Sequence, residues 1–424
     1  MKADNIDIDL QDLSDADKAV LDLLKSRQSA MKDRVMGWSA VNTGSWNADG
    51  LNAFSKLLAQ ALSETQAQVD FIPTQAIEKV NDKGEMSEFQ SGPVVRAQAR
   101  KEAPMQVILT GHYDTVFPPG TFETIKDLGE GKMGGPGLAD MKGGITVMIE
   151  ALKAFEACGD KEKLGYTIIL SPDEEIGNFA SNPMIMDAAK DAHIGLTFEP
   201  SMEDGSMVGG RKGSAVFDIV FHGRSAHAGR NPEDGNSALM AAAQFALEIE
   251  ALNGQYEGVT LNVGSIDGGD AVNIVPALAV VRMGVRAPDS AAADWATQKV
   301  RAAYENALER RGITGHFHGG FYRPPKPRNA AQNKLISDVT LTGKALGLSL
   351  TFRDTGGVCE GNNVFAAGTP NIDTLGVRGG RIHSSEEFMV TESLSERAGL
   401  AALILNRIAD GRIDAKTIKK LMKN

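Results

Sequence analysis

At 424 residues the chain exceeds the roughly 250–300 residues at which a single hydrophobic core usually stops growing, so we expect two domains. The net charge of −11 argues against a nucleic-acid or anionic-membrane partner, because both require concentrated Lys and Arg. The N-terminus lacks the apolar core of a signal peptide, and no stretch approaches the roughly 20 apolar residues of a membrane span. With two cysteines and no disulfide framework, these features favour a cytoplasmic protein.

Helix-like and strand-like patterns alternate over the first 200 residues. In chain order the patterns predict helices at 15–35 and 48–64, a strand or hairpin at 80–103, a strand at 105–109, a helix at 144–158, a strand at 166–170, a helix at 182–190 and a strand at 193–198. This alternation predicts an α/β fold in which a mostly parallel sheet has helices on both faces.

The regular alternation of strand-like and helix-like patterns ends near residue 210. The patterns then predict a strand at 214–221, a helix at 236–252, strands at 259–263 and 278–283, a helix at 290–311 and a strand at 315–322. The order β-α-β-β-α-β is that of a ferredoxin-like α+β unit, so we expect an inserted domain over residues 210–323. After a Pro-rich linker, the first domain resumes with a helix at 330–346, strands at 348–353 and 371–375, and a helix at 391–409.

Five polar clusters each follow an apolar, strand-like run, where an open α/β sheet has its binding crevice. The clusters contain His112, Asp140, the run Asp173-Glu174-Glu175, Glu199 and His383. Singly, each has a plainer explanation, such as a turn aspartate, an acidic helix N-terminus or an exposed loop histidine. Together they supply two imidazoles and at least four carboxylates, a ligand set that suits a pair of zinc ions.

The glycine-rich segment around Asp140 does not match a nucleotide-binding loop, because Asp140 stands at the third glycine position of the dinucleotide fingerprint. Two spacings instead fit a metal site. Asp114 lies two residues after His112, so in an extended backbone both point to one side and the carboxylate could orient the imidazole. The adjacent Glu174 and Glu175 diverge, so that one can bind metal while the other holds a proton or a water.

In this order the motifs resemble the di-zinc aminoacylase and carboxypeptidase family, which includes bacterial glutamate carboxypeptidases, acetylornithine deacetylase and succinyl-diaminopimelate desuccinylase. The matching motifs are His-x-Asp-Thr-Val, Gly-x-Gly-x-x-Asp-Met-Lys-Gly-Gly, Asp-Glu-Glu-x-Gly, Glu-Pro and a late His. The resemblance implies a di-zinc catalytic domain made of residues 1–209 and 324–424. It also implies that residues 210–323 form a lid and dimerisation domain.

The resemblance implies a role for each residue of the motifs. Asp140 would bridge two zinc ions, with His112 and Glu199 completing one site and Glu175 and His383 the other. Manganese or cobalt could occupy the same ligands. The remaining implied features are Glu174 as general base, Asp114 as the partner of His112, and a cis Asp140–Met141 peptide bond.

On the lid, the resemblance extends to Ser225-Ala-His227, a segment whose histidine stabilises the tetrahedral oxyanion, in dimers often from the neighbouring subunit. Asn273 and Arg286 resemble residues that contact the scissile group and the substrate's α-carboxylate. Gly357 resembles part of a loop that closes the pocket, and Arg323 is a candidate for an acidic side-chain pocket. Each of these residues also has a purely structural explanation, such as a surface turn, a turn cap or a solvated charge. We expect a homodimer formed through the lid.

Two departures from the family pattern leave the substrate open. Cys359 and Glu360 stand where the desuccinylase-type loop has Ser and Asp. We expect a zinc-dependent hydrolase that cleaves an amide next to a free α-carboxylate, with small peptides or N-acyl amino acids as substrates and glutamate as the first choice at the carboxyl side. The alternatives are an N-acyl amino acid deacylase and, from a different class, a catalytically silent metal-binding protein.

Overall fold

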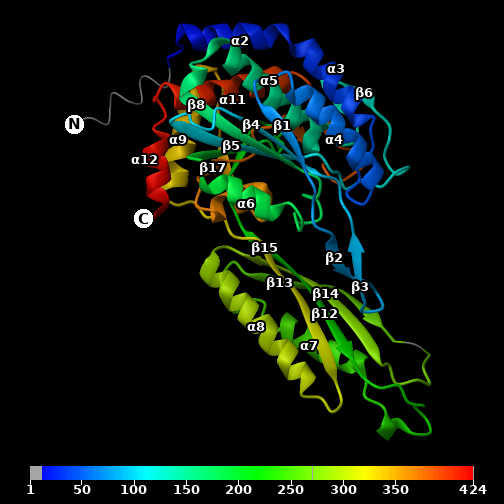
Figure 1. Cartoon of the computed structure of the whole chain (residues 1–424). Helices are drawn as coiled ribbons and strands as arrows, with labels where there is room; N and C mark the ends of the chain where they lie inside the picture. The colour runs from blue at the N-terminus through cyan, green and yellow to red at the C-terminus, as the bar shows by residue number, and fades with distance from the viewer. Residues whose placement is uncertain (1–11, 270, 424) are drawn as a thin grey trace.

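The computed structural model describes residues 12–269 and 271–423. Residues 1–11, to which the signal-peptide prediction applies, lie outside the described residues. Among the described residues, none of the helices has the length and apolar character needed to cross a membrane. The chain forms a larger body and a smaller body, connected by adjacent strands and a protruding hairpin (Figure 1).

A six-stranded sheet forms the centre of the larger body. In spatial order its strands are β1 (Gln68–Ile72), β4 (Val94–Ala99), β8 (Leu164–Ser171), β5 (Met105–His112), β9 (Ile194–Thr197) and β17 (Asn371–Ile372). The strands from β8 to β17 run parallel, whereas β4 and β1 join antiparallel at one edge. The parallel strands are runs of buried aliphatic residues, as expected where helices cover both faces. The predicted mostly parallel α/β architecture is confirmed.

Helices cover both faces of this sheet (Figure 1). Because successive strand residues point to opposite sides, Ile108 packs against α6 (Asn182–Lys190) and α10 (Glu360–Ala366), while Val107 and Leu109 face the main core. The helices that contribute to the main core are α2 (Asp15–Ser26), α3 (Gln28–Ser39), α4 (Ala48–Leu62), α5 (Gly144–Cys158), α9 (Ala330–Ala345), α11 (Ser393–Ala409) and α12 (Ala415–Lys420).

Three smaller sheets complete the larger body. A five-stranded sheet has the order β10 (Ser201–Met202), β18 (Arg378–Gly380), β19 (Phe388–Val390), β7 (Lys132–Gly134) and β6 (Lys126–Gly129). The other two are the parallel pair β11 (Met207–Arg211) and β16 (Phe352–Thr355), and the antiparallel hairpin β2 (Ile77–Val80) and β3 (Met86–Phe89). The β2–β3 hairpin extends from the larger body onto the smaller one (Figure 1).

The smaller body, which we call the lid, is a four-stranded antiparallel sheet with two helices. Its strands are β12 (Gly213–His222), β13 (Thr260–Gly268), β14 (Leu278–Ala287) and β15 (Thr314–Arg323), in the spatial order β13-β14-β12-β15. The helices α7 (Ala238–Glu250) and α8 (Ser290–Leu308) pack on one face of the sheet and enclose a separate apolar core. This is the predicted ferredoxin-like arrangement.

Some elements differ from the sequence prediction. The strand expected at 348–353 is β16, which begins only at Phe352, and the strand expected at 371–375 is reduced to β17. The helices α10 and α12 were not predicted. Cys158 and Cys359 are both free thiols, as expected.

Candidate metal centre

The predicted polar clusters meet at the carboxyl ends of the parallel strands. β5 ends at His112, β8 leads into the Asp173-Glu174-Glu175 run, and β9 leads into Glu199. The short helical segment Leu138–Gly143 brings Asp140 to the same edge, and the loop between β18 and β19 brings His383. This edge is where open α/β sheets bind ligands. The Asp140–Met141 peptide bond is cis, as the resemblance implied.

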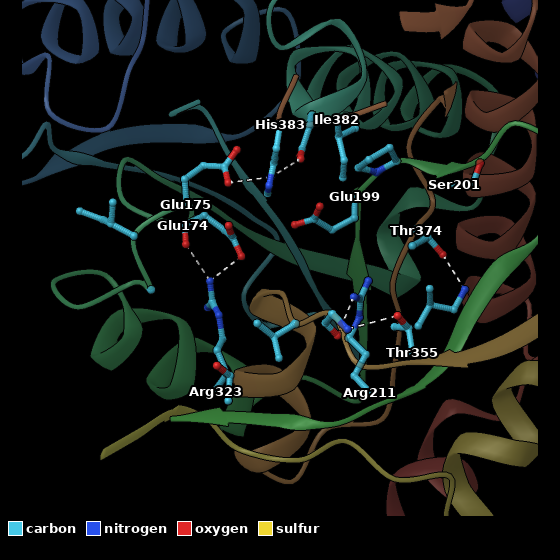
Figure 2. A pocket seen from close by; sticks show the side chains of 18 of the residues that line it. Glu174, Glu175, Glu199, Ser201, Arg211, Arg323, Thr355, Thr374, Ile382 and His383 are labelled. Carbon is cyan, nitrogen blue, oxygen red and sulfur yellow. Dashed lines mark hydrogen bonds and ion pairs between the residues drawn. The ribbon is translucent and has the colours of Figure 1, made fainter. Parts of the chain in front are cut away.

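The carboxylate of Asp140 lies between two imidazoles. Its Oδ1 is 3.1 Å from His112 Nε2, and its Oδ2 is 3.3 Å from His383 Nε2. Each imidazole faces a second carboxylate: His383 Nε2 lies 3.1 Å from Glu175 Oε2, and His112 Nε2 lies 3.7 Å from Glu199 Oε1. Figure 2 shows Glu175 and His383 turned toward each other on one wall of a cavity. The five side chains thus form two overlapping sets that share Asp140.

One buried carboxylate of this cluster, that of Glu199, has an oxygen, Oε1, without a hydrogen-bond partner among the described residues. Burial, reinforced by the charge of Asp140, raises the pKa of Glu199 well above its ordinary value and that of Glu175 to about 8. An unpaired buried carboxylate is costly, and a cation removes that cost. The donor set therefore fits divalent metal ions, and its nitrogen and oxygen ligands suit zinc, manganese or cobalt.

The neighbouring carboxylates favour the protonated form of both imidazoles. Burial opposes protonation of His112, but hydrogen bonds to Asp114 and Asp140 outweigh it and raise the pKa of His112 well above its usual range. Hydrogen bonds to Asp140 and Glu175 raise the pKa of His383 to about 11. Metal ligands must be deprotonated, so binding of a cation here would displace these protons.

Asp114 connects the two halves of the cluster. Its Oδ1 lies 3.3 Å from His112 Nδ1, the ring nitrogen that faces away from Asp140. The same carboxylate accepts the backbone N–H groups of Glu174 at 3.0 Å and Glu175 at 3.1 Å, and the hydroxyl of Ser45 at 2.8 Å. Asp114 is fully buried, so these contacts hold the imidazole and the double-glutamate turn in one arrangement.

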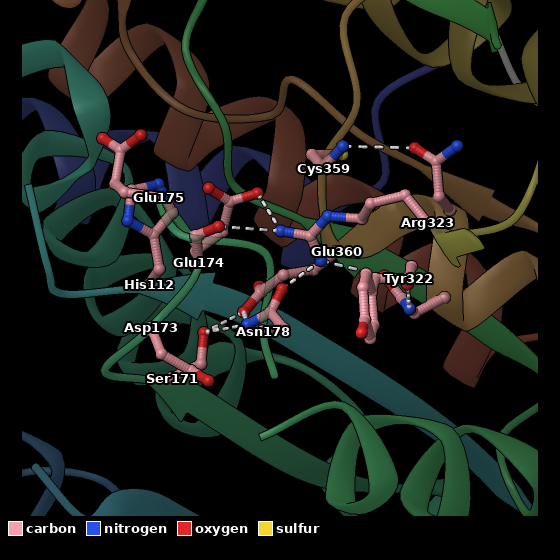
Figure 3. A network of polar contacts seen from close by, with 12 residues as sticks. His112, Ser171, Asp173, Glu174, Glu175, Asn178, Tyr322, Arg323, Cys359 and Glu360 are labelled. Atoms are coloured by element: carbon pink, nitrogen blue, oxygen red, sulfur yellow. Dashed lines mark hydrogen bonds and ion pairs between the residues drawn. The ribbon is translucent and has the colours of Figure 1, made fainter. Parts of the chain in front are cut away.

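Glu174 points toward the cavity beside the cluster and pairs with Arg323. Arg323 is buried, and its Nη2 also donates to the backbone oxygen of Glu174 at 3.0 Å. Its Nη1 donates to Asn363 Oδ1 at 2.9 Å and to Oδ1 of Asn178. Figure 3 shows the guanidinium between Glu174 and Asn178. Arg323 thus holds the Glu174 side chain and its turn.

A cavity of about 610 Å³, which we call the metal cavity, is lined by the candidate ligands Asp140, Glu175, Glu199 and His383 and extends to residues of the lid. Arg286 and Gly357 both line it. The Arg286 guanidinium donates to Ser214 Oγ at 2.5 Å, and among the described residues no carboxylate pairs with it. Burial lowers the pKa of Arg286. A half-buried guanidinium with no acidic partner is a natural site for a substrate anion.

Comparison with known proteins identifies the chain. Residues 108–407 match the family described as Peptidase family M20/M25/M40. The chain belongs to that family. The carboxypeptidase G2 of Pseudomonas sp. (strain RS-16) is 29% identical over 311 residues, which cover 72% of this chain and 74% of that protein. The chain is therefore a family M20 hydrolase of peptide or linear amide bonds.

Two solved structures show the same fold as this M20 hydrolase. A family M20 metallo-carboxypeptidase from Sulfolobus solfataricus superposes with a TM-score of 0.69 at 14% identity, covering 90% of this chain and 99% of that chain. A dinuclear metal-binding peptidase of the family from Bacillus subtilis superposes with a TM-score of 0.63 at 14% identity, covering 91% and 99%. These likenesses concern the fold.

Two candidate residues of the M20 hydrolase are not brought into the cavity. His227 lies on an exposed loop of the lid, joined to Ile274 by an isolated β-bridge, and Asn273 lies beside that bridge. Neither belongs to the described residues that line the cavity. A role for them in this site therefore requires a movement of the lid or a second copy of the chain.

The structure adds two residues that the sequence analysis missed. Glu387 Oε1 accepts the backbone N–H groups of Ala139 at 2.9 Å and Asp140 at 3.1 Å, and burial raises the pKa of Glu387 to about 7. Arg211 lines the cavity and donates to Asp373 Oδ2 at 2.8 Å. The available signal for Glu387 was an acid placed directly before the apolar run of β19. Arg211 had only a glycine-rich context and no distinguishing signal.

Proposed function

We propose that this M20 hydrolase is a di-zinc enzyme that cleaves an amide bond next to a free α-carboxylate. One observation supports the proposal: a single cavity is lined by members of the carboxylate–imidazole cluster and by Arg286, which pairs with no carboxylate among the described residues. A substrate that places its amide at the cluster can place its carboxylate at Arg286. The resemblance to glutamate carboxypeptidases makes glutamate our first choice for the residue that carries the carboxylate.

We propose the following roles for the residues of the site. His112, Asp140 and Glu199 would hold one cation, and Asp140, Glu175 and His383 the other. When bound, such a pair polarises the amide carbonyl and lowers the pKa of a water molecule. Glu174 would take a proton from the attacking water and deliver it to the leaving nitrogen. Asp114 fixes the tautomer of His112, and Arg323 holds Glu174 in position.

The first test is a hydrolysis screen of the zinc-loaded protein against small peptides and N-acyl amino acids. Glu174→Gln should still bind metal but lose turnover by about a thousandfold or more, because the amide cannot accept the water's proton. Metal content from elemental analysis and initial rates give the two readouts. Glu162→Gln, at an exposed glutamate, serves as the control and should match the wild type in both.

The identity of the products separates the two enzymatic readings. Release of a C-terminal amino acid from peptides indicates a carboxypeptidase, and preferential release of a simple acyl group indicates a deacylase. If the wild type binds two zinc ions and hydrolyses nothing in the panel, the hypothesis of a catalytically silent metal-binding protein replaces both enzymatic hypotheses.

We also propose that two copies of the chain associate through the lid. β13 is an edge strand of the lid sheet, so its outer backbone groups can pair with a second chain. The adjacent helix α7 exposes Met240 and Leu247, the latter with 73% of its surface accessible. An edge strand beside exposed apolar side chains is typical of an interface between subunits.

A further inference from the structure

A second cavity of about 550 Å³ lies beside the metal cavity, between the β2–β3 hairpin and the lid sheet. We call it the hairpin cavity, and its wall includes Trp46, Val80, Met86, Val216, Met283 and Tyr322. Trp46, Met86 and Val216 keep 46%, 47% and 43% of their surface exposed. Exposed aromatic and aliphatic side chains that converge on one hollow indicate a site for an apolar ligand.

The hairpin is fixed to the lid, so the hairpin cavity has a built floor. Val80 packs against Val220 and Val280 of the lid sheet. Arg282 of β14 donates to Asp82 in the hairpin turn at 2.7 Å and to the backbone oxygen of Val80 at 3.3 Å. Apolar packing and a charged hydrogen bond thus join the same two elements.

Two cations of this wall, Lys79 and Arg282, are engaged by neighbouring groups, whereas Arg286 stands at the boundary with the metal cavity. Arg282 pairs with Asp82 and Asp267, and the ammonium of Lys79 lies 5.0 Å from the ring centre of Trp46. Trp46 in turn packs edge-on against Phe89 at 4.9 Å between ring centres. The aromatic part of the wall is therefore held in place, and it presents ring and aliphatic surface to the cavity.

The hairpin cavity adjoins the metal cavity along a shared wall. The side chains that line both are Ile176, Phe179, Val216, Arg286 and Tyr322. Ile176 directly follows the double glutamate, so the shared wall begins at the metal ligands. The metal cavity has another, polar side, which carries Arg211, Thr355 and Thr374. A substrate bound at the cluster thus has polar surface to one side and the apolar hairpin cavity to another.

We propose that the hairpin cavity binds the acyl half of the substrate, and that this half is a bulky apolar group. The proposal rests on the proposed function and narrows its substrate class to amino acids that carry a large aliphatic or aromatic N-acyl group. The free carboxylate then stays in the metal cavity at Arg286, which stands in the wall between the two spaces.

The test compares N-acetyl, N-octanoyl and N-(1-naphthoyl) derivatives of alanine and of glutamate. The wild type should prefer the two bulky acyl groups over acetyl by at least tenfold in kcat/KM. Met86→Glu places a charge in the hairpin cavity at a half-exposed position, so the fold should tolerate it. This variant should lose at least tenfold on the bulky substrates and change less than twofold on the acetyl ones. Leu128→Glu, on the exposed strand β6, should change neither.

Two outcomes of the kinetic test overturn the proposal. One is an equal loss for acetyl and bulky substrates in Met86→Glu. The other is a preference in the wild type that follows the amino-acid side chain rather than the acyl group.

If no substrate is turned over, that result counts against the proposed function alone. A binding measurement then tests the hairpin cavity separately. Free 1-naphthoate should quench the fluorescence of Trp46 in the wild type. The same ligand should quench the tryptophan fluorescence of neither Met86→Glu nor Trp46→Phe. The fluorescence of Leu128→Glu should be quenched as in the wild type. Absence of quenching in the wild type overturns the proposal.

Discussion

Glu360 is a fully buried acid two residues after Val358, which lines the metal cavity. Its Oε1 accepts the hydroxyl of Ser171, and its Oε2 has no hydrogen-bond partner among the described residues. Burial raises the pKa of Glu360 from 4.5 to about 7. Figure 3 places it beside Asn178, close to the Glu174–Arg323 pair. Glu360, at this departure from the family pattern, thus lies in the buried polar network next to the double-glutamate turn.

The shift in Glu360 predicts a stability that depends on pH. Between pH 4.5 and about 7 the unfolded chain loses the proton while the folded chain keeps it, so ionisation favours unfolding as the pH rises. The full cost, roughly 3 kcal/mol, is present above pH 7 and absent below pH 4.5. Glu360→Gln lacks this cost. The melting temperature of Glu360→Gln minus that of the wild type should therefore increase as the pH is raised from 4.5 to 8.

That measurement is made on chelator-treated protein, because metal binding also exchanges protons. Glu162→Gln, at the surface, gives the baseline for removing a glutamate. A melting-temperature difference for Glu360→Gln that stays constant across this pH range would contradict the assignment.

Arg286 is the residue on which substrate recognition depends in the proposed function. Arg286→Ala should weaken substrates with a free α-carboxylate by roughly tenfold to a hundredfold in kcat/KM, the range expected for a lost charged hydrogen bond. Matched substrates with an amidated carboxyl group should lose little. Arg286→Lys should recover part of the loss, because it keeps the charge but not the forked geometry. Equal losses on free and blocked substrates would refute the carboxylate role.

At the scale of elements, a close contact between α5 and the strand end at Phe198 aligns the candidate metal ligands Asp140 and Glu199. Gly144 opens α5, and a Cβ at this position would lie 1.9 Å from the carbonyl oxygen of Phe198. Asp140 stands just before the helix, and Glu199 directly follows Phe198. Glycine thus allows the approach that brings these two carboxylates to one imidazole.

A methyl group at Gly144 should separate the two ligands. Gly144→Ala should lower the free energy of unfolding by about 1–3 kcal/mol, as overpacking usually does, and should weaken zinc binding at least tenfold. Gly37→Ala in α3 is the control, because its Cβ would meet no atom within 4 Å. That variant should gain up to about 1 kcal/mol from helix propensity. Thermal denaturation and a zinc titration measure both effects, and wild-type zinc affinity in Gly144→Ala would rule out the role of this contact.

The elements that the sequence predicted well share a physical property: a long, regular apolar pattern. β5, β8 and the six lid elements have it, and their order was enough to place the polar clusters at one sheet edge. The pattern at 80–103 predicted only a strand or hairpin where the structure has β2, β3 and β4, and α10 was not predicted, because β2, β3 and α10 are short and are stabilised by distant partners. Val80 of the hairpin packs against lid residues some 140–200 positions later, and α10 is capped by Cys359 within a glycine-rich turn. The roles of Glu387 and Arg211 depend on similar long-range contacts.

At the scale of the whole molecule, the metal cavity is open toward the lid, and the lid is tied to the larger body by the hairpin contact as well as by its two chain connections. Within this arrangement His227 stays on an exposed loop outside the cavity. The proposed lid dimer offers a way for this histidine to act, because a partner subunit could present it to the neighbouring site. Leu247→Glu on α7 would then abolish both the dimer and the activity, which sedimentation and rate measurements can follow together.

Mixing two inactive variants tests this arrangement directly. Glu174→Gln removes the general base, and His227→Ala removes the lid histidine, so each homodimer should be nearly silent. In a hybrid dimer, the subunit that keeps Glu174 would receive His227 from its partner, which gives one complete site. Random reassociation makes half of the dimers hybrid, so an equal mixture should regain about a quarter of the wild-type activity. If His227 acts within its own chain, the mixture stays inactive, and a mixture of Glu174→Gln with Asp140→Asn should stay inactive in either case.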